Sequence, residues 1–316
     1  MSAPASHLSN KFRALIVLMR PHQYSKNLFI FAPAFFGFGQ YDLGAVWGYL
    51  LLGFVGFCLI ASGIYALNDI IDAQQDRLHP TKCNRPVASG AISATQAGLF
   101  SLALLLIGGG AYIMLGCIYR SDVADDSLAG LFWAFSAPVL LYLLLNILYC
   151  LRLKHIAIVD IFCIASGFVI RLWIGANIIQ VALSHWIVIT TFLLAVFLAL
   201  AKRRDDILLL ESGKKVRKNI EGYNRVFLDI AMGISASLVM VAYIFYSIDE
   251  GVNERLHTHN LYLTSVFVLL GIFRYMQITF VLQQSSSPSK ILLRDRFLQL
   301  VILAWLGSFI IIGFWR

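Results

Sequence analysis

The stretch NDIIDAQQDRLHP, residues 68–80, holds the side chains best suited to chemistry. It places Asn68, Asp69, Asp72 and Asp76 within nine positions, directly after about twenty-five residues that carry no charge. If the apolar segment continues as a helix, the aspartates stand at i, i+3 and i+7 and share one face. Neighbouring carboxylates repel one another unless a cation lies among them, and oxygen-only ligands suit a hard ion such as Mg²⁺. These residues are therefore predicted to hold Mg²⁺ and, through it, a diphosphate.

The alternative interpretation is a solvated helix end whose aspartates balance Arg77, Lys82 and Arg85. The position of these aspartates at the end of an apolar segment favours a functional role over a solvated helix end, because ionisable groups at membrane depth usually take part in function. The continuation H-P-T-K-x-x-R-P puts Lys82 and Arg85 where they could bind the remaining oxygens of the same diphosphate. His79 precedes Pro80, so it either shapes the turn or donates to a phosphate.

The composition requires a membrane protein. Of 316 residues, 59% are hydrophobic and 13% charged, and the mean hydropathy is +0.77. A soluble domain of this length could not bury so much apolar surface. About twenty apolar residues cross the hydrocarbon of a bilayer, and the sequence predicts an all-α bundle that fills residues 1–316 as a single transmembrane domain. The nine predicted spans are 27–40 (short, with Pro33 inside it), 44–67, 93–119, 128–150, 156–179, 185–201, 227–248, 260–282 and 297–315.

The distribution of positive charge predicts the orientation. Twenty Lys and Arg residues fall on the face that carries the N-terminus and three on the opposite face. Because positively charged loops stay in the cytoplasm, the loops 68–92 and 202–226 are predicted to be cytoplasmic, and the C-terminus lies outside. Residues 1–26 are interpreted as a cytoplasmic interfacial segment, with a short helix over 9–19 capped by Ser9.

The net charge, the hydropathy and the cysteine pattern bear on which partners and sites are expected. The net charge of +8 suits anionic membrane lipids and phosphate substrates. A soluble nucleic-acid binder is excluded by the hydropathy, so no nucleic acid is expected as a partner. The five cysteines include no C-x-x-C pair and are interpreted as small apolar residues.

The order of three motifs resembles a known family. N-D-x-x-D-x-x-x-D and H-P-T-K-x-x-R-P follow L-M-R-P-H-Q-Y-S-K-N at 18–27, and this order is similar to the UbiA superfamily of intramembrane transferases. The resemblance implies a helical bundle of about nine spans, with Mg²⁺ and a diphosphate bound in a polar cavity that opens to the cytoplasm. Lys26 in the leading motif is either a phosphate contact or a topology anchor.

The segment 202–226 departs from the usual pattern of that superfamily. A second D-x-x-x-D motif is replaced by a mostly cationic sequence that begins K-R-R-D-D. Many cations suit substrates with several phosphates, such as phosphoribosyl pyrophosphate and a polyprenyl phosphate. K-R-R-D-D and Y-N, with L-K-H-x-x-x-x-D (153–160) and G-F-V-I-R (167–171), resemble the branch that makes polyprenyl-phosphoryl-phosphoribose. The substrate contacts implied are Asn68, Lys154, Asp160, Arg171, Lys202, Arg203, Arg204, Tyr223 and Asn224.

Several of these residues have a structural alternative. Asp160 and Arg171 lie in one span and either form a polar network or bind the ribose hydroxyls or the 5-phosphate. Tyr223 and Asn224 either bind sugar or phosphate or cap the next helix. Arg274 lies inside a span without an evident partner.

The predicted reaction transfers 5-phosphoribosyl from phosphoribosyl pyrophosphate to a decaprenyl-type polyprenyl phosphate and releases pyrophosphate, with Asp69, Asp72 and Asp76 as the catalytic residues. Its product would supply cell-envelope polysaccharide synthesis in the inner membrane of a bacterium. The alternative is a prenyltransferase that moves a polyprenyl group from its diphosphate to an aromatic acceptor. A transporter would carry charges on both faces, whereas the clusters here lie on the cytoplasmic side. The oligomeric state stays open, a homo-oligomer included.

Overall fold

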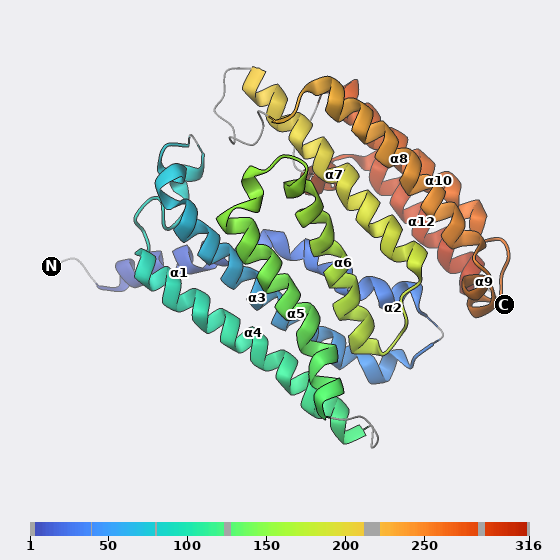
Figure 1. Cartoon of the computed structure of the whole chain (residues 1–316), viewed down its shortest axis with the longest axis horizontal. Coiled ribbons are helices and arrows are strands. Elements are labelled where there is room, and N and C mark those ends of the chain that lie inside the picture. Colours follow the sequence, from blue (N-terminus) through green and yellow to red (C-terminus); the bar gives the residue numbers. More distant parts are fainter. Residues whose placement is uncertain are drawn as a thin grey trace. The chain divides into compact units, whose positions relative to one another are not determined.

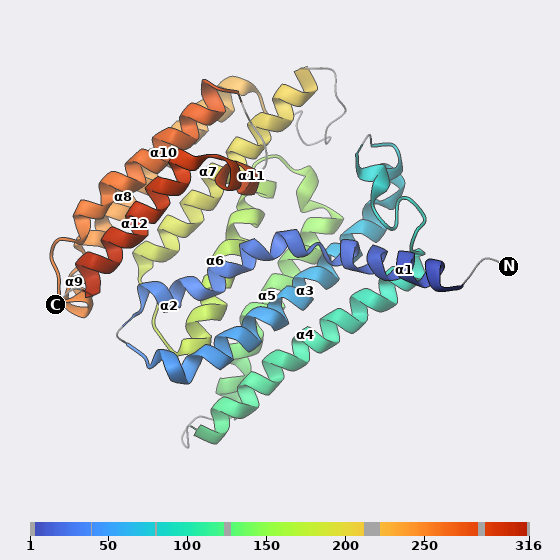
Figure 2. The same cartoon turned by 180° about the vertical axis from the view of Figure 1, so that it is seen from behind.

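The chain is helical throughout the part that the structure describes. The computed structural model describes residues 4–38, 40–79, 81–122, 128–211, 222–283 and 288–314, and no strand occurs within these ranges. The helices form two compact units (Figures 1 and 2). The first unit comprises Met1–Phe36, Tyr41–Leu153 and Ile170–Val181, and the second comprises Gly37–Gln40, Lys154–Val169 and Ala182–Arg316.

The first unit is built around one long helix, α3. Figure 1 shows α3, α4 and α5 running beside one another, and their buried face includes Phe57, Leu115 and Val139. The unit also receives the second half of α6. Its elements are α1 (Pro4–Met19), η1 (Pro21–Phe31), α2 (Ala32–Phe36), α3 (Leu43–Arg77), η2 (Lys82–Asn84), α4 (Ala94–Asp122), α5 (Leu128–Leu151) and α6 (Val159–Ile179).

The second unit contains the first half of α6. Its core includes Phe197, Leu228 and Met232, contributed by α7 and α8. In both views α8, α10 and α12 lie side by side (Figures 1 and 2). Its other elements are η3 (Leu153–His155), α7 (His185–Glu211), α8 (Arg225–Ile248), α9 (Glu250–Leu256), η5 (Leu261–Thr264), α10 (Ser265–Phe280), α11 (Pro288–Arg294) and α12 (Arg296–Phe314).

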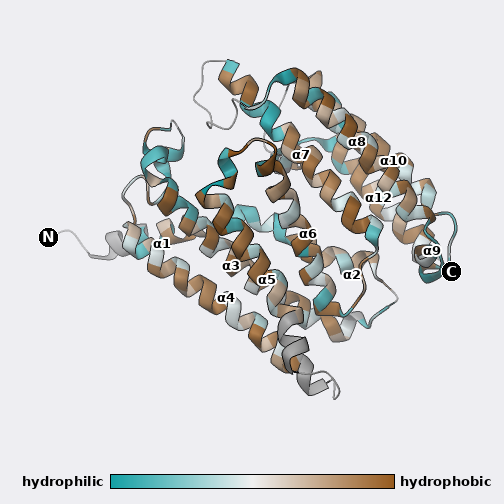
Figure 3. Ribbon diagram, in the orientation of Figure 1, coloured by the Kyte–Doolittle hydropathy of each residue, from teal (hydrophilic) through white to brown (hydrophobic). Residues whose placement is uncertain are grey.

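The helices confirm a multi-pass membrane protein. Among the described residues, eight helices are long and apolar enough to cross a bilayer, and each overlaps one predicted span, although Gly44–Arg77 and His185–Glu211 each extend ten residues beyond the predicted end. Hydrophobic residues dominate these helices, while hydrophilic ones gather at the end of α3 (Figure 3). The predicted span 27–40 forms no long α-helix and is divided between η1 and α2, so helix length does not reproduce the count of nine.

The predicted helix over 9–19 is present but begins earlier. It starts at Pro4, so the expected cap at Ser9 is wrong. Proline suits the first turn of a helix, because the backbone N–H it lacks would have no partner there.

Glycines allow close helix packing in the first unit. In α4, a Cβ at Gly108 would lie 2.7 Å from the carbonyl oxygen of Gly56 in α3. A Cβ at Gly175 in α6 would lie only 2.0 Å from the carbonyl oxygen of Ile30 in η1. Small residues at such positions let helix backbones approach within a membrane.

Replacing Gly175 with Ala is therefore expected to destabilise the protein by about 1–3 kcal/mol, since the added methyl forces two backbones apart. Reversible unfolding in mixed micelles with increasing SDS measures the change. Gly109→Ala is the matched control, because a Cβ at Gly109 meets no heavy atom within 4 Å. That change should be neutral or stabilising by up to about 1 kcal/mol, since Ala favours a helix over Gly. Equal losses of stability in both variants would contradict the close approach of the two backbones at Gly175.

Arg274, for which the sequence offered no partner, is paired with Asp295. Its Nη2 lies 2.6 Å from Asp295 Oδ2, and Asp295 also accepts from the Leu298 backbone N–H at the start of α12. The bonds from Arg274 hold the pKa of Asp295 below its usual value. The pair therefore stabilises the fold above the unfolded pKa of about 3.9, and this contribution is lost as the pH falls through the folded pKa.

Lowering the pH from about 6 to 3 should accordingly destabilise the wild type more than an Asp295→Asn variant, because the variant has no carboxylate at this position to protonate. Unfolding curves at the two pH values test this. Parallel losses in both proteins would show that Asp295 does not stabilise the fold through its charge.

Candidate active site

The acidic motif lies on the last three turns of α3. This helix is capped by Asp42, whose side chain accepts from the Gly44 backbone N–H, and it continues without a break from Leu43 to Arg77. The predicted continuation of the apolar segment as one helix is thus confirmed. Since the helix is unbroken, Asp69, Asp72 and Asp76 share one face, as the spacing predicts.

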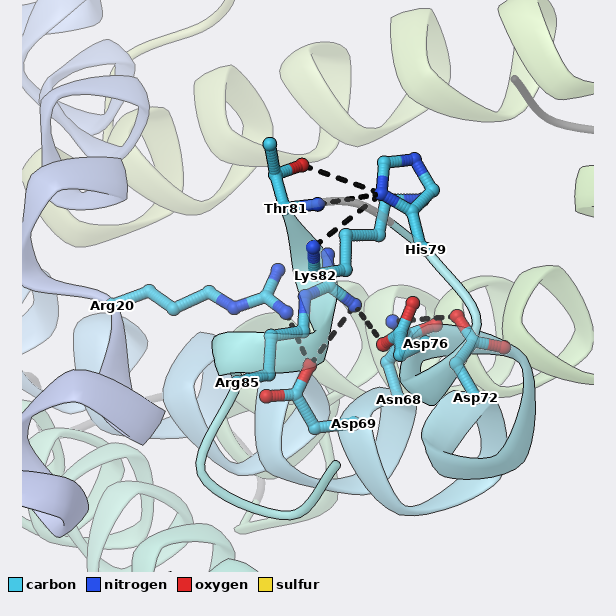
Figure 4. A network of polar contacts seen from close by, with 9 residues as sticks. All are labelled: Arg20, Asn68, Asp69, Asp72, Asp76, His79, Thr81, Lys82 and Arg85. Atoms are coloured by element: carbon cyan, nitrogen blue, oxygen red, sulfur yellow. Dashed lines mark hydrogen bonds and ion pairs between the residues drawn. The ribbon is translucent and has the colours of Figure 1, made fainter. Parts of the chain in front are cut away.

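Two arginines contact this face from other parts of the first unit (Figure 4). Arg20, between α1 and η1, forms an ion pair with Asp69. Arg85, after η2, places Nη1 2.6 Å from Asp76 Oδ2 and 3.3 Å from Asp69 Oδ1. Both carboxylates are buried, with 1% of Asp69 and 4% of Asp76 exposed. One guanidinium nitrogen thus lies between two buried carboxylates.

Asp72 and the residues after the helix complete the motif. Asn68 Nδ2 donates to Asp72 Oδ2 at 3.2 Å, and Asp72 is half-buried. His79 Nδ1 accepts from the backbone N–H groups of Thr81 and Lys82, at 3.3 and 3.4 Å. His79 therefore shapes the turn, in agreement with the first of its two interpretations. This turn carries Lys82 and Arg85 back toward α3 (Figure 4).

The donor chemistry of the motif fits a hard divalent cation. Asn68, Asp69, Asp72 and Asp76 offer oxygen ligands along one helix face, which is the set that Mg²⁺ prefers. In the described part of the chain, however, no three acidic, His or Cys side chains converge closely enough to hold a metal. Asp69 and Asp76 are turned to the arginines instead. Metal binding would require these ion pairs to open or to be shared.

Arg20 is a site residue that the sequence analysis missed as a substrate or metal contact. Its backbone is left-handed, with φ 55° and ψ 58°, immediately before Pro21. This conformation is unfavourable for a non-glycine residue, and the following proline disfavours it further. Such strain at a polar cluster is typical of functional sites. The only signal in the sequence was the position of Arg20 in the motif R-P-H-Q.

A second buried polar cluster lies in the second unit. Arg203 Nε and Nη2 each lie 2.6 Å from Asp160 Oδ2, and the hydroxyl of Tyr223 donates to Asp160 Oδ1 at 2.7 Å. The same hydroxyl accepts from the Ile158 backbone N–H. Burial, with the bond to Asp160, raises the pKa of Tyr223, so it remains a neutral donor. Arg203 also contacts Asp206, at 2.9 Å. Asp160 thus belongs to a polar network with Arg203 and Tyr223, whereas the sequence analysis grouped it with Arg171.

Arg171 has different neighbours. Its Nε donates to Asn27 Oδ1 at 2.9 Å, and its guanidinium lies over the rings of Phe57 and Tyr142, with centroids 5.0 and 5.1 Å away. Asn27 in turn donates to Cys58. Although Asp160 and Arg171 lie on one helix, each thus belongs to its own cluster.

The other predicted substrate contacts are distributed over both units. Asn224 caps α8 by accepting from the Phe227 backbone N–H, which fits its capping interpretation. Arg204 is buried against Asp229 and the carbonyl of Thr279. Residues 212–221 of the cationic segment lie outside the described residues. Lys26 is half-buried on η1, Lys82 half-buried at the start of η2, Lys154 buried in η3 and Lys202 half-buried on α7.

Comparison with known proteins places this architecture in a family. A sequence model described as the UbiA prenyltransferase family matches residues 30–303. A protein of Mycolicibacterium smegmatis named decaprenyl-phosphate phosphoribosyltransferase is 31% identical over 95% of this chain and 92% of its own length. The protein of that name from Corynebacterium glutamicum is 30% identical over 92% of this chain and 84% of its own length.

Solved structures agree with the fold. The structure of a UbiA homologue from Archaeoglobus fulgidus bound to GPP and Mg²⁺ aligns with a TM-score of 0.65, covering 94% of this chain and 99% of that one at 18% identity. At this identity the likeness establishes the fold alone. Because the family pattern runs through residues 30–303 and relatives of about 30% identity align over nearly the whole length, the chain belongs to the UbiA prenyltransferase family.

Proposed function

We propose that this protein transfers the 5-phosphoribosyl group of phosphoribosyl pyrophosphate to a decaprenyl-type polyprenyl phosphate and releases pyrophosphate. The reaction would take place on the cytoplasmic side of a bacterial inner membrane and would supply a precursor for cell-envelope polysaccharide. The observation that carries the proposal is the acidic face of α3, faced by Arg20 and Arg85 at the end of a membrane-spanning helix. The relatives named decaprenyl-phosphate phosphoribosyltransferase support the choice of donor and acceptor.

The site residues divide by charge. Asn68, Asp69, Asp72 and Asp76 would hold the Mg²⁺, and bound Mg²⁺ would offset the negative charge of the departing pyrophosphate. Arg20, Lys82 and Arg85 would bind the remaining pyrophosphate oxygens, for which the planar guanidinium is well suited. Lys26, Lys154, Arg171 and Lys202 are the proposed contacts for the other phosphates and the ribose.

The bond changes are those of a simple displacement. The bond between ribose C1 and the pyrophosphate oxygen breaks, and pyrophosphate leaves with the electron pair. A phosphate oxygen of the lipid forms the new bond to C1 from the opposite face. This nucleophile is already anionic near neutral pH, so no general base is required. The protein contributes alignment and electrostatic stabilisation of the leaving group.

An assay with two donors tests the proposal. The purified protein in lipid nanodiscs is given Mg²⁺, phosphoribosyl pyrophosphate labelled in the ribose, and decaprenyl phosphate. Label should enter the organic-extractable lipid with release of one pyrophosphate per transfer, and a chelator should stop both. A parallel reaction with a polyprenyl diphosphate and an aromatic acid tests prenyl transfer. Prenylation without ribose transfer would overturn the proposal in favour of that alternative.

A further inference from the structure

The carboxylates expected to hold a metal are already neutralised by the protein itself. Asp69 contacts both Arg20 and Arg85, and Asp76 contacts Arg85 (Figure 4). Buried carboxylates require such compensation, because an unpaired charge inside a protein is strongly destabilising. The two arginines thus take the electrostatic role that a divalent ion would otherwise fill.

The ion pairs of Arg20 and Arg85 with the buried carboxylates are placed so that they can open. Asp69 and Asp76 are almost fully buried, whereas the side chains of Arg20 and Arg85 retain 19% and 22% of their exposure. Mg²⁺ binds oxygen at about 2.0–2.1 Å, closer than the nitrogen of Arg85 approaches either carboxylate. A metal would therefore compete directly with Arg85 for the same oxygens. An arginine that loses a carboxylate needs another anion of similar shape, and a phosphate is one.

We infer that Arg20 and Arg85 are exchangeable counter-ions, which neutralise the acidic face while it holds no metal and transfer to the diphosphate when the metal arrives. Metal and diphosphate would then bind interdependently. The metal alone must displace the arginines without offering them a new partner, whereas the diphosphate supplies that partner. By thermodynamic linkage each ligand raises the affinity for the other by the same factor. The identity of the diphosphate rests on the proposed function, but the competition between metal and arginine does not.

Metal binding without substrate tests the competition. Mn²⁺ binding to the full chain in nanodiscs is measured from the loss of the free-ion electron paramagnetic resonance signal. An Arg85→Gln variant should bind Mn²⁺ about 10-fold more tightly than the wild type, because one competing cation is gone. The matched control is Arg77→Gln, which removes the same charge from an exposed side chain that donates to the Ala88 carbonyl. Screening by solvent should limit its effect to less than about 3-fold.

The diphosphate should respond in the opposite direction. With Mg²⁺ present, Arg85→Gln should bind pyrophosphate about 10-fold or more weakly, by calorimetry, because a phosphate contact is lost. Arg85→Lys, which keeps the charge, should give values between those of the wild type and Arg85→Gln for both ligands. Tighter metal binding together with weaker diphosphate binding distinguishes an exchangeable counter-ion from a residue that merely supports the fold, whose loss would weaken both.

Two results would overturn the inference. One is Mn²⁺ affinity in Arg85→Gln that is unchanged or weakened relative to the wild type. The other is an equal increase in Arg77→Gln. If Arg85→Gln unfolds during purification, Arg85→Lys and the thermal stabilisation of each folded variant by Mn²⁺ provide the same comparison. If ribose transfer fails while Arg85→Gln binds Mn²⁺ more tightly as expected, the proposed function alone is refuted. If the wild type transfers ribose while Arg85→Gln binds Mn²⁺ with unchanged affinity, only this inference is refuted.

Discussion

Replacing Asp72 with Asn is expected to lower kcat/KM for phosphoribosyl transfer by about 10²–10³-fold, the range seen when one group that stabilises developing charge is removed. Asp72 is half-buried, and Asn68 donates to it. Asparagine has nearly the same shape and can still accept that hydrogen bond. The loss should therefore fall on activity, with a change in stability below about 1 kcal/mol. Initial rates at varied phosphoribosyl pyrophosphate and Mg²⁺, with an unfolding curve for each variant, separate the two effects.

A charge-matched control is available on α9, in the second unit. Glu254 is exposed on α9, and Glu254→Gln removes one negative charge without touching the acidic motif. This variant should keep wild-type kcat/KM. Activity in Asp72→Asn within about 3-fold of the control would remove Asp72 from the proposed metal site. A further prediction is that the defect of Asp72→Asn is smaller at high Mg²⁺, because a weakened site fills by mass action.

The acidic face could be predicted from the sequence because its geometry is local. Spacing along one unbroken helix fixes which side chains share a face, so Asp69, Asp72 and Asp76 required no tertiary information. The membrane spans could also be predicted from the sequence, since the thickness of the bilayer sets a minimum length for an apolar helix. The segment 27–40 differed because Pro33 lies near its middle, next to the boundary where η1 ends and α2 begins.

Ion pairs between residues far apart in the sequence could not be predicted. Arg20 and Asp69 are separated by 49 residues, and Asp160 and Arg203 by 43. Pairing across such distances depends on how helices pack, and a single sequence does not encode this in any local pattern. The left-handed backbone at Arg20 was likewise unforeseeable, because residues before proline normally avoid that region. The sequence therefore predicted the acidic face of α3 and placed Arg85 near it, but it did not predict the pairing of Arg20 with Asp69.

The pair formed by Asp160 and Arg203 should contribute strongly to stability through its burial. Asp160 has no exposed surface and Arg203 is 1% exposed. Asp160→Ala leaves the guanidinium buried without its carboxylate partner and removes the acceptor for Tyr223. The expected loss is about 3–5 kcal/mol, as for other buried pairs from which one partner is removed. SDS unfolding in mixed micelles measures this directly.

A double variant distinguishes the cost of the orphaned charge from the value of the pair. Asp160→Leu combined with Arg203→Met replaces both charges by apolar side chains of similar size. Such replacements of buried pairs are often nearly neutral, so the double variant should regain most of the stability lost in Asp160→Leu alone. Tyr223→Phe should cost about 1–3 kcal/mol, because the Ile158 backbone N–H and Asp160 both lose a partner. Additive losses in the double variant would show instead that the two side chains stabilise the fold independently, and the cluster would then not act as one ion pair.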